Sequence, residues 1–535
     1  MKKWIVITIL CSAQFVMILD STVMNVSISV VAKDLHTTIS GMQAAITFYA
    51  LTMAALMLTG GKLGDIWGRH RTFRIGTVVY GIGSLITSLS PSLIVLLFGW
   101  SFIEGIGAIL VIPAIAALAA INYQGQDRVV AFSLLGAATG LAAAVGPLIG
   151  GVVTTYFSWR YVFAAETVVM IGVLLVSKKI RDEKVSNVAK LDYRSSLLSA
   201  VGMILFVFGI LQSKTWGWIN PLKSPTINGH EIAPLGISLV AYLILAGLLV
   251  LWWFVSRQRK LEKTGGHPLL KVSMIRIATL RSGLGVLLGQ YFTIAALFFV
   301  VPVYLQINLG YDALKTGLKL LPLSFGLLIF SVIGSRLSLK HSARRISRLG
   351  QIGLALGTLI VIAGVNTQLN GFVFWIGMFI IGTGFGLLAS QINNVNMSAV
   401  SKDETSEVGG LQGTFQNLGT SLGTAVVGSF FILLLTSGFN TAVLSNSTLT
   451  SDQKNAITAQ TQDGVQIVSK SMVNQAVTKH GGNAATAQTV STLYDQAQIR
   501  AIKSAMFIVF VIGVFALILS RNLPRDVAAK DTSNP

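Results

Sequence analysis

The sequence predicts an all-α integral membrane protein with fourteen transmembrane helices. Of its 535 residues, 53% are hydrophobic and only 11% are charged, against about 25% charged in an average soluble domain. Windows of about 20 mainly apolar residues, the length that crosses a bilayer, recur along nearly the whole chain. The 53 glycines and 11 prolines are typical of closely packed membrane helices. These observations exclude a soluble enzyme, a disordered scaffold and a nucleic-acid-binding protein.

The first apolar window is predicted to be a retained helix. It begins with two lysines, as a signal peptide does, but it is too long, contains Asp20 and lacks a cleavage site. The fourteen predicted spans are residues 4–32, 43–61, 72–89, 92–121, 129–155, 159–178, 195–213, 234–256, 282–307, 313–335, 349–366, 371–400, 407–436 and 501–520.

The charge distribution predicts the orientation in a bacterial cell membrane. The chain has 40 basic and 20 acidic residues, a net charge of +20, and placing the N-terminus in the cytoplasm puts most bases in cytoplasmic segments, as the positive-inside rule requires. An even number of spans then returns the C-terminus to the cytoplasm. The largest contributions follow spans six and eight: Lys178, Lys179, Arg181, Lys184, Lys190 and Arg194, then Arg257, Arg259, Lys260 and Lys263.

Two outward segments differ from short loops. Residues 214–234 contain Trp216, Trp218, Pro221 and Pro225, which indicates a folded interfacial loop with its tryptophans at the lipid headgroups. Residues 437–500 are rich in Ala, Thr, Gln and Ser, with apolar residues at helical spacing and a break at Gly481-Gly482. We expect a helical hairpin there, with the last span extending outward from Asn483 as one long helix. A solvated extension without a role in transport is the alternative.

The loop after span two, residues 61–71 (GKLGDIWGRHR), combines glycines with a charge cluster. Gly64 and Gly68 allow close helix approach or a tight turn, and Asp65 with Arg69 and Arg71 can latch one helix bundle to another. A positive-inside loop without further function is the alternative. The spacing of the string resembles the loop between helices two and three of the major facilitator superfamily.

Three further segments resemble the fourteen-helix drug/proton antiporter branch of that superfamily, the quaternary-ammonium and multidrug exporters. Span one contains LDSTVMNV, with Asp20 and Asn25 at the branch's usual places. Span six opens with Ser-Trp-Arg at residues 158–160. Span five contains the antiporter-like GPLIGG, in which a proline bends the helix and glycines pack it against a neighbour: Gly146, Pro147, Gly150 and Gly151.

The resemblance covers essentially the whole chain and implies two six-helix bundles that rock about a central cavity in alternating access. It divides the chain into an N-terminal bundle (1–178), a linker with two extra central helices (179–281), a C-terminal bundle (282–520) and a cytoplasmic tail (521–535).

The chain also departs from the family pattern. In span four, Ser101 stands where the family has an arginine, and Glu104 stands where it has a glutamine. In span six, Glu166 replaces a common asparagine. The second-half copy of the loop motif, residues 335–345, has Leu339 in place of the acid.

The energy source is predicted to be a proton gradient, with no cofactor and no metal. The chain lacks a phosphate-binding GxxxxGK[ST] loop, all six histidines fall in loops or at span ends, and Cys11 is the single cysteine. Only Asp20, Glu104 and Glu166 lie well inside spans, and acids at membrane depth are usually functional.

Position along the spans gives the depth of each acid. Asp20 and Glu104 lie about 12 residues from the outer end, or roughly 18 Å deep, and Glu166 lies about 7 residues in, or roughly 10 Å. We expect Asp20 and Glu104 to face each other near the midplane, with Glu166 nearer the outside. Without a basic neighbour in these spans, such acids suit proton coupling. The alternative is that each is a neutral acid satisfied by helix carbonyls or neighbouring hydroxyls.

The second half offers only neutral polar groups at depth, many near the cytoplasmic ends of spans twelve and thirteen. Most of these amides are expected to hydrogen-bond between helices. The candidate substrate cavity combines residues of both halves: Asn25, Trp100, Ser101, Gln290, Gln391, Asn394 and Gln416.

The sequence therefore predicts a monomeric proton-coupled exporter of drugs or amphipathic, cationic toxic compounds, conferring multidrug efflux and antibiotic resistance. An exporter of a lipid, peptide or self-made antibiotic in the same fold is the alternative. An importer does not match the antiporter-like segment, an intramembrane enzyme lacks a buried histidine, and a passive channel leaves the buried acids unexplained.

Overall fold

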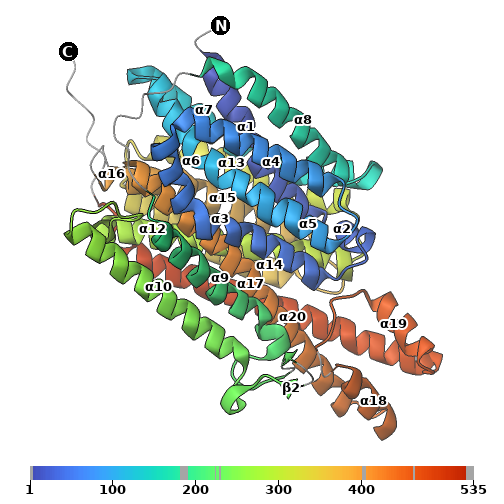
Figure 1. The fold of residues 1–535 in the computed structure, drawn as a ribbon. Helices are drawn as coiled ribbons and strands as arrows, with labels where there is room; N and C mark the ends of the chain where they lie inside the picture. The colour runs from blue at the N-terminus through green and yellow to red at the C-terminus, as the bar shows by residue number, and fades with distance from the viewer. Residues whose placement is uncertain are drawn as a thin grey trace.

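The computed structural model describes residues 4–180, 191–222, 225–227, 230–400, 405–461 and 464–525, and these are almost entirely helical (Figure 1). The N-terminal bundle consists of α1 (Ile5–Val26), α2 (Ile28–Asp34), α3 (Ile39–Trp67), α4 (Arg69–Ser88), α5 (Leu93–Leu96), the π-helical segment η2 (Leu97–Glu104), α6 (Gly105–Asn122), α7 (Gly125–Tyr156), α8 (Arg160–Val176) and the short turn η3 (Ser177–Lys179).

Two extra helices and a second bundle follow. The extra helices are α9 (Tyr193–Trp216) and α10 (Leu239–Lys263), joined through strands β1 (Thr226–Ile227) and β2 (His230–Glu231) and the turn η4 (Pro234–Gly236). The C-terminal bundle consists of α11 (Val272–Ile275), α12 (Ala278–Val303), η5 (Tyr304–Asn308), α13 (Ala313–Leu337), α14 (Ala343–Gly364), α15 (Gly371–Ala389), α16 (Ile392–Ser398), α17 (Thr405–Ser445), α18 (Ser451–Thr461), α19 (Lys470–Lys479), α20 (Ala484–Leu519) and η7 (Ser520–Asn522).

The helices match the predicted spans closely. Among the described residues, 13 helices are long and apolar enough to cross a membrane by length and composition. The one predicted span not among these 13, residues 72–89, coincides with α4, which falls short of this test because it begins with three bases and is rich in Gly, Ser and Thr. It nevertheless packs along α6 and α8, so small polar side chains serve contacts between helices rather than contact with lipid.

Two predicted spans are interrupted. The span predicted at 371–400 coincides with the membrane-length segment Gly371–Ser398, but inside it α15 ends at Ala389 and α16 starts at Ile392. At the break, Gln391 turns back and its Nε2 donates to the carbonyl of Gly334 at 3.1 Å. The span predicted at 4–32 divides at Ser27, whose hydroxyl lies 2.7 Å from that of Thr154.

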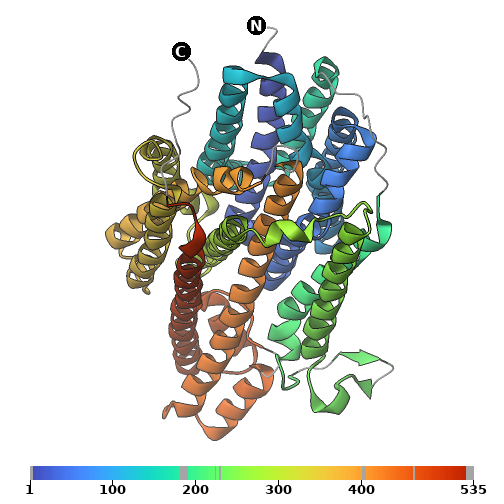
Figure 2. The ribbon, with the colours of Figure 1, turned by 90° about the vertical axis from the view of Figure 1, so that its left-hand side faces the viewer.

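The two ends of the molecule differ. Figures 1 and 2 place the start of α1 and the end of α20 at one end, the termini side, and α18, α19 and β2 at the opposite end, the hairpin side. The long last helix is present, because α20 begins directly after Asn483, whose side chain accepts from the backbone N–H of Thr486. The segment before it is more than a simple hairpin, since α17 also projects and α18 and α19 follow it.

Residues 214–234 form a folded loop, but it contains the short β1–β2 pair rather than irregular chain alone. Its tryptophans pack on protein: Trp218 lies 5.5 Å from the ring of Phe430 on α17, and Trp216 lies edge-on to Phe208 at 6.0 Å. Packing against protein therefore accounts for both tryptophans, without the predicted position at the lipid headgroups.

The extra helices lie against both bundles, since α9 contacts α3 and α17. Lys214 Nζ donates to Gln43 Oε1 at 3.2 Å, and Gln43 Nε2 donates to the carbonyl of Thr424 at 3.0 Å. One chain of hydrogen bonds thus joins α9, α3 and α17 where the two bundles meet.

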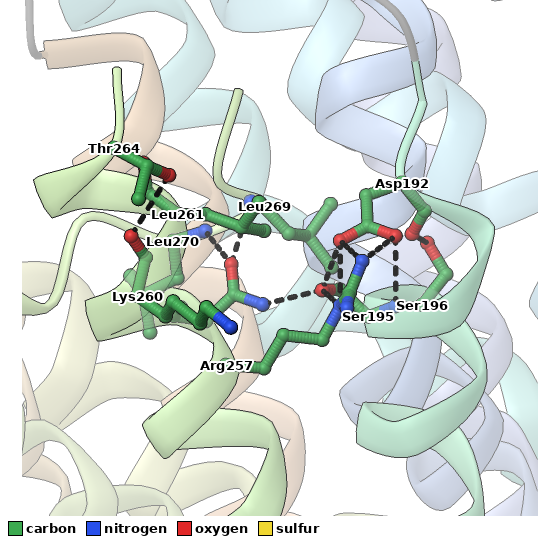
Figure 3. A network of polar contacts seen from close by, with 10 residues as sticks. Asp192, Ser195, Ser196, Arg257, Lys260, Leu261, Thr264, Leu269 and Leu270 are labelled. Carbon is green, nitrogen blue, oxygen red and sulfur yellow. Dashed lines mark hydrogen bonds and ion pairs between the residues drawn. The ribbon is translucent and has the colours of Figure 1, made fainter. Parts of the chain in front are cut away.

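A polar network fastens the termini side of α9 and α10 (Figure 3). Arg257 donates to both Asp192 oxygens at 3.0 Å. Gln258 is fully buried, donates to Ser195 Oγ at 2.5 Å and accepts from the backbone N–H groups of Leu269 and Leu270. The network therefore ties both extra helices to the connection that leads into the C-terminal bundle. Of the basic residues predicted on this side, Arg181, Lys184 and Lys190 lie outside the described residues, as does the tail beyond residue 525.

Replacing Gln258 should destabilise the protein. In Gln258→Leu, the buried N–H groups of Leu269 and Leu270 lose their acceptor, at a cost of roughly 1–3 kcal/mol for each unsatisfied group. We expect the midpoint of thermal unfolding in detergent to fall by several degrees. Arg259→Leu, at an exposed neighbouring position, is the control and should unfold as the wild type does; equal midpoints for all three proteins would contradict this role.

The Asp192–Arg257 pair should stabilise the protein in a pH-dependent way. Partial burial by itself raises the pKa of Asp192, but hydrogen bonds from Ser195 and Arg257 outweigh it and hold that pKa below its usual value. A lowered pKa in the folded state adds stability that is present above the unfolded value of about 3.9 and is lost as pH falls through the folded value. The difference in unfolding midpoint between wild type and Arg257→Gln should therefore be larger at pH 7 than at pH 3. Arg259→Gln should show no such difference at either pH.

Candidate functional site

The indole of Trp100 in η2 holds Asp20 of α1. Trp100 Nε1 donates to Asp20 Oδ1 at 2.8 Å and to Oδ2 at 3.0 Å, and both side chains are buried. The ring of Tyr49 on α3 stacks on Trp100 with centroids 4.8 Å apart and planes inclined by 9°. Three helices thus fix the orientation of this carboxyl group.

The three predicted acids meet at one point inside the N-terminal bundle. One carboxylate oxygen each of Asp20, Glu104 and Glu166 lies within 4.8 Å of the other two. Their side chains are 0%, 0% and 2% exposed. The prediction that Glu166 lies nearer the outside than the other two is therefore wrong, because α8 brings it to the same cluster.

These carboxylates receive few hydrogen bonds. Ser84 donates to Glu166 Oε2 at 3.3 Å, whereas Glu166 Oε1 and both oxygens of Glu104 are buried without a hydrogen-bond partner among the described residues. The three helical stretches that hold the acids, residues 5–26, 97–122 and 161–176, contain no lysine, arginine or histidine. The cluster is thus a buried set of acids without countercharge, and among the described residues it is the one group placed to hold a cation.

Glycines allow the helices to approach closely around the acids. A Cβ at Gly83 of α4 would lie 2.6 Å from the backbone N of Glu104, and one at Gly107 would lie 2.5 Å from the backbone N of Tyr80. Glu104 ends the π-helical segment, and such segments occur frequently at functional sites. The backbone of α4 therefore touches that of η2 and α6, which places Ser84 and Glu104 beside Glu166.

Tyr49, Tyr80 and Ser84 are not among the predicted site residues, yet they surround the acids. Tyr80 is fully buried and its hydroxyl has no partner among the described residues. Gly76, Tyr80, Gly83, Ser84 and Thr87 repeat at helical spacing along one face of α4. This stripe of small and polar residues is the sequence pattern from which Tyr80 and Ser84 could have been predicted, because such a stripe marks a helix face packed against protein.

The residues predicted for a substrate cavity have separate hydrogen-bonding roles and different degrees of burial in the structure. Ser101, at the place of the family arginine, donates to the carbonyl of Ala45 at 2.8 Å, and Asn25 donates to the carbonyl of Ser21 in its own helix at 2.6 Å. Gln391 serves the break between α15 and α16, Asn394 is exposed, and Gln416 is half-buried on α17. Gln290 is buried, and its Oε1 has no partner among the described residues. Trp100 belongs to the acid cluster.

The loop motif turns the chain from α3 to α4. Gly68 has φ +90°, a conformation that favours glycine, whereas a Cβ at Gly64 would meet nothing within 4 Å. Asp65 pairs with Arg69 one turn away, within the same bundle, and Arg71 is exposed. The predicted latch between bundles is thus not formed by this ion pair.

The antiporter-like segment of α7 packs against both bundles. On one side, a Cβ at Gly146 would lie 1.9 Å from Thr22 Oγ1 and one at Gly150 would lie 3.0 Å from Val23 Cα, both on α1. On the other side, a Cβ at Gly151 would lie 2.8 Å from the carbonyl oxygen of Ala313 on α13. A Cβ at Gly317 of α13 would in turn lie 2.4 Å from the carbonyl oxygen of Pro147.

The bundles also hydrogen-bond to each other on the hairpin side. Gln306 of η5 donates to the carbonyl of Val26 at 2.5 Å and accepts from the hydroxyl of Ser29. Leu314 N donates to Thr155 Oγ1 at 3.1 Å. In this structure the two bundles are therefore in direct contact at that end.

The Ser-Trp-Arg segment forms a clamp at the start of α8. Trp159 Nε1 donates to Asp34 Oδ2 at 3.0 Å, Arg160 pairs with the same carboxylate, and Arg160 Nη2 donates to the carbonyl of Ser90 at 2.7 Å. Burial alone raises the pKa of Asp34, but Arg160 and Trp159 outweigh it and lower that pKa overall. The clamp fastens α8 to α2 and to the connection between α4 and α5.

The structure has two bundles of membrane-length helices that contact each other at one end, and one bundle contains buried acids. This is the architecture of a multi-pass membrane transporter. Residues 10–223 and 229–424 match the Major Facilitator Superfamily. The chain therefore belongs to this superfamily, as the resemblance of its motifs predicted. It is a transporter and not an enzyme.

Known proteins similar to the chain agree with this assignment. A probable actinorhodin transporter of Streptomyces coelicolor is 28% identical over 442 residues, covering 81% of this chain and 73% of that protein. A puromycin resistance protein of Streptomyces alboniger is 28% identical over 437 residues, covering 80% and 81%. A bacterial homologue of the human lysosomal transporter Spinster, crystallised in an inward-facing, unoccupied conformation, shares the fold at a TM-score of 0.60, with 12% identity and 97% of both chains covered.

Adding a methyl group at Gly317 should separate the bundles on the hairpin side. In Gly317→Ala, the new carbon meets a backbone oxygen at 2.4 Å, which no side-chain rotation relieves. With spin labels at positions 156 and 318 in a Cys11→Ser background, we expect a longer distance to gain population in double electron–electron resonance.

Gly136→Ala is the matched control on α7, because a Cβ at Gly136 meets nothing within 4 Å. It should leave the distance distribution unchanged. An unchanged distribution in Gly317→Ala as well would show that the contact does not limit the approach of the bundles.

Proposed function

We propose that the protein is a monomeric proton-coupled exporter of amphipathic, cationic toxic compounds that works by alternating access, with both termini in the cytoplasm. The observation that carries this proposal is the cluster of Asp20, Glu104 and Glu166, whose carboxylate oxygens lie within 4.8 Å of one another. The names of the relatives, an antibiotic transporter and a resistance protein, support export of toxic small molecules.

The cluster suits an exchange of protons against a cation. When ionised, buried carboxylates repel one another and lack the hydration that stabilises them in water. A bound proton removes this cost, and so does the positive group of a ligand, because opposite charges attract strongly in a medium of low dielectric constant. Proton and cationic substrate therefore compete for the same acids, as antiport requires.

The three acids have different surroundings within this exchange. Asp20 accepts two hydrogen bonds from Trp100, whereas Glu104 accepts none from the described residues. The N–H of Trp100 stabilises the ionised form of Asp20. We therefore assign Asp20 as the ionised acid that pairs with the positive charge of the substrate, and Glu104 as the acid that takes up and releases the proton. Glu166, held on one oxygen by Ser84, extends the cluster toward α8.

The contacts between the bundles support alternating access. The predicted orientation places the hairpin side outside the cell, so the contacts of Gln306 and Gly317 close the protein toward the outside in this structure. Opening that end while the termini side closes would expose the acids to the external medium. No ATP site is needed for this cycle, since the proton gradient supplies the free energy.

Removing the charge of Asp20 should abolish exchange. In everted membrane vesicles with an imposed pH gradient, Asp20→Asn should reduce proton-driven accumulation of ethidium by at least about 10-fold, because the amide can neither release a proton nor carry a negative charge. Glu104→Gln should reduce it to a similar extent, and addition of ethidium should no longer release protons in either variant.

Asp452→Asn, at an exposed position of α18, is the matched control and should transport at the wild-type rate. Retention of proton-driven accumulation by Asp20→Asn at equal protein level would contradict the proposal. Accumulation that persists in the wild type without a pH gradient would argue against proton coupling altogether.

A further inference from the structure

A groove of about 770 Å³ runs along the side of the N-terminal bundle between α1, α7 and α8. Figure 1 shows α8 at the edge of this bundle. Phe15 and Leu19 of α1, Leu141 and Val153 of α7, and Tyr161 and Glu166 of α8 are among its lining residues. Cavities of roughly 300–1,000 Å³ accommodate small-molecule ligands, so the groove has the volume of a binding site.

The inner wall of the groove reaches the acid cluster. Glu166 lines this wall, and only 2% of its surface is exposed. Its Oε1 has no hydrogen-bond partner among the described residues. Leu19, directly before Asp20, lines it as well. A ligand in the groove therefore contacts the side chain of Glu166, whose buried Oε1 lies behind the groove wall without a hydrogen-bond partner among the described residues.

The mouth of the groove is apolar and aromatic. Phe157 is 70% exposed, Tyr161 is 62% exposed and Leu141 is 49% exposed. Leu141 belongs to α7 and Tyr161 to α8, two helices of membrane-crossing length and composition, and Phe157 directly follows α7. Exposed apolar side chains on such helices face lipid, so the groove opens toward the bilayer, and its aromatic rings can attract a cation on its way in.

We propose that this groove is a binding site for a lipophilic monovalent cation that enters from the bilayer, with its apolar body between α1, α7 and α8 and its positive charge at Glu166. The proposal rests on the proposed function for its substrate class and adds the place and the route. Charge complementarity selects the occupant: an anionic lipid headgroup would be repelled by the three carboxylates, and a neutral compound would leave the negative charge of an ionised Glu166 uncompensated.

Two adjacent valines of α8 provide a matched test. Val169 lines the groove, whereas Val168 does not and is 68% exposed. Val169→Trp fills the groove, and Val168→Trp adds the same ring to the lipid-facing surface. Equilibrium binding of tetraphenylphosphonium to the purified full-length protein, without a pH gradient, should weaken at least 10-fold in Val169→Trp and stay unchanged in Val168→Trp.

Glu166→Gln should weaken tetraphenylphosphonium binding by a similar factor, because the amide keeps the shape but loses the charge. Ala165→Trp, also in the groove, is a second filling variant in case Val169→Trp does not fold. Size-exclusion elution and the unfolding midpoint establish that each variant is folded. Wild-type affinity in both filling variants would overturn the proposal, as would an absence of tetraphenylphosphonium binding to the wild type.

These binding measurements distinguish a failure of the groove proposal from a failure of the proposed function. Binding is measured at equilibrium and does not depend on proton exchange. Loss of binding in the groove variants, together with a wild type that shows no proton-driven transport, would keep the groove and overturn the antiport. Unchanged binding in the groove variants, together with transport that Asp20→Asn abolishes, would keep the antiport and overturn the groove.

Discussion

The N-terminal bundle is organised around three carboxylates that are buried together. Asp20, Glu104 and Glu166 come from three different helical elements, and α4 supplies Ser84 and the glycine contact that brings η2 close. Only Trp100 and Ser84 donate hydrogen bonds to the acids among the described residues. A polar group buried without a partner is costly, so the packing of these helices and the charge state of the cluster depend on each other.

Helix α7 connects this cluster to the interface between the bundles. Its glycines touch Thr22 and Val23, two and three residues after Asp20, while Pro147 and Gly151 touch α13 of the other bundle. A shift of α1 near Asp20 would therefore reach the interface through one helix. Closely packed helices transmit such shifts because their contacts leave no free volume to absorb them.

The two halves contribute differently. The acids and the lateral groove belong to the first half, whereas Gln306 and Gln391 of the second half form structural hydrogen bonds. The extra helices are fastened by the Asp192–Arg257 pair and by Gln258, which also holds the chain leading into the second bundle. The buried acids are thus concentrated in one bundle, and the other contacts that bundle on the hairpin side.

The sequence by itself determined the approximate positions of the membrane-length helices, the rare buried acids and the positions of the motifs, because a bilayer imposes local rules on length, apolarity and charge. It placed Glu166 nearer the outside than the other two acids and did not show the break between α15 and α16. Only the tertiary structure decided that residues 20, 104 and 166 meet and that a groove leads to them. The reason is that helix rotation and tilt depend on contacts between distant segments, such as Gly83 with Glu104, which no local pattern specifies.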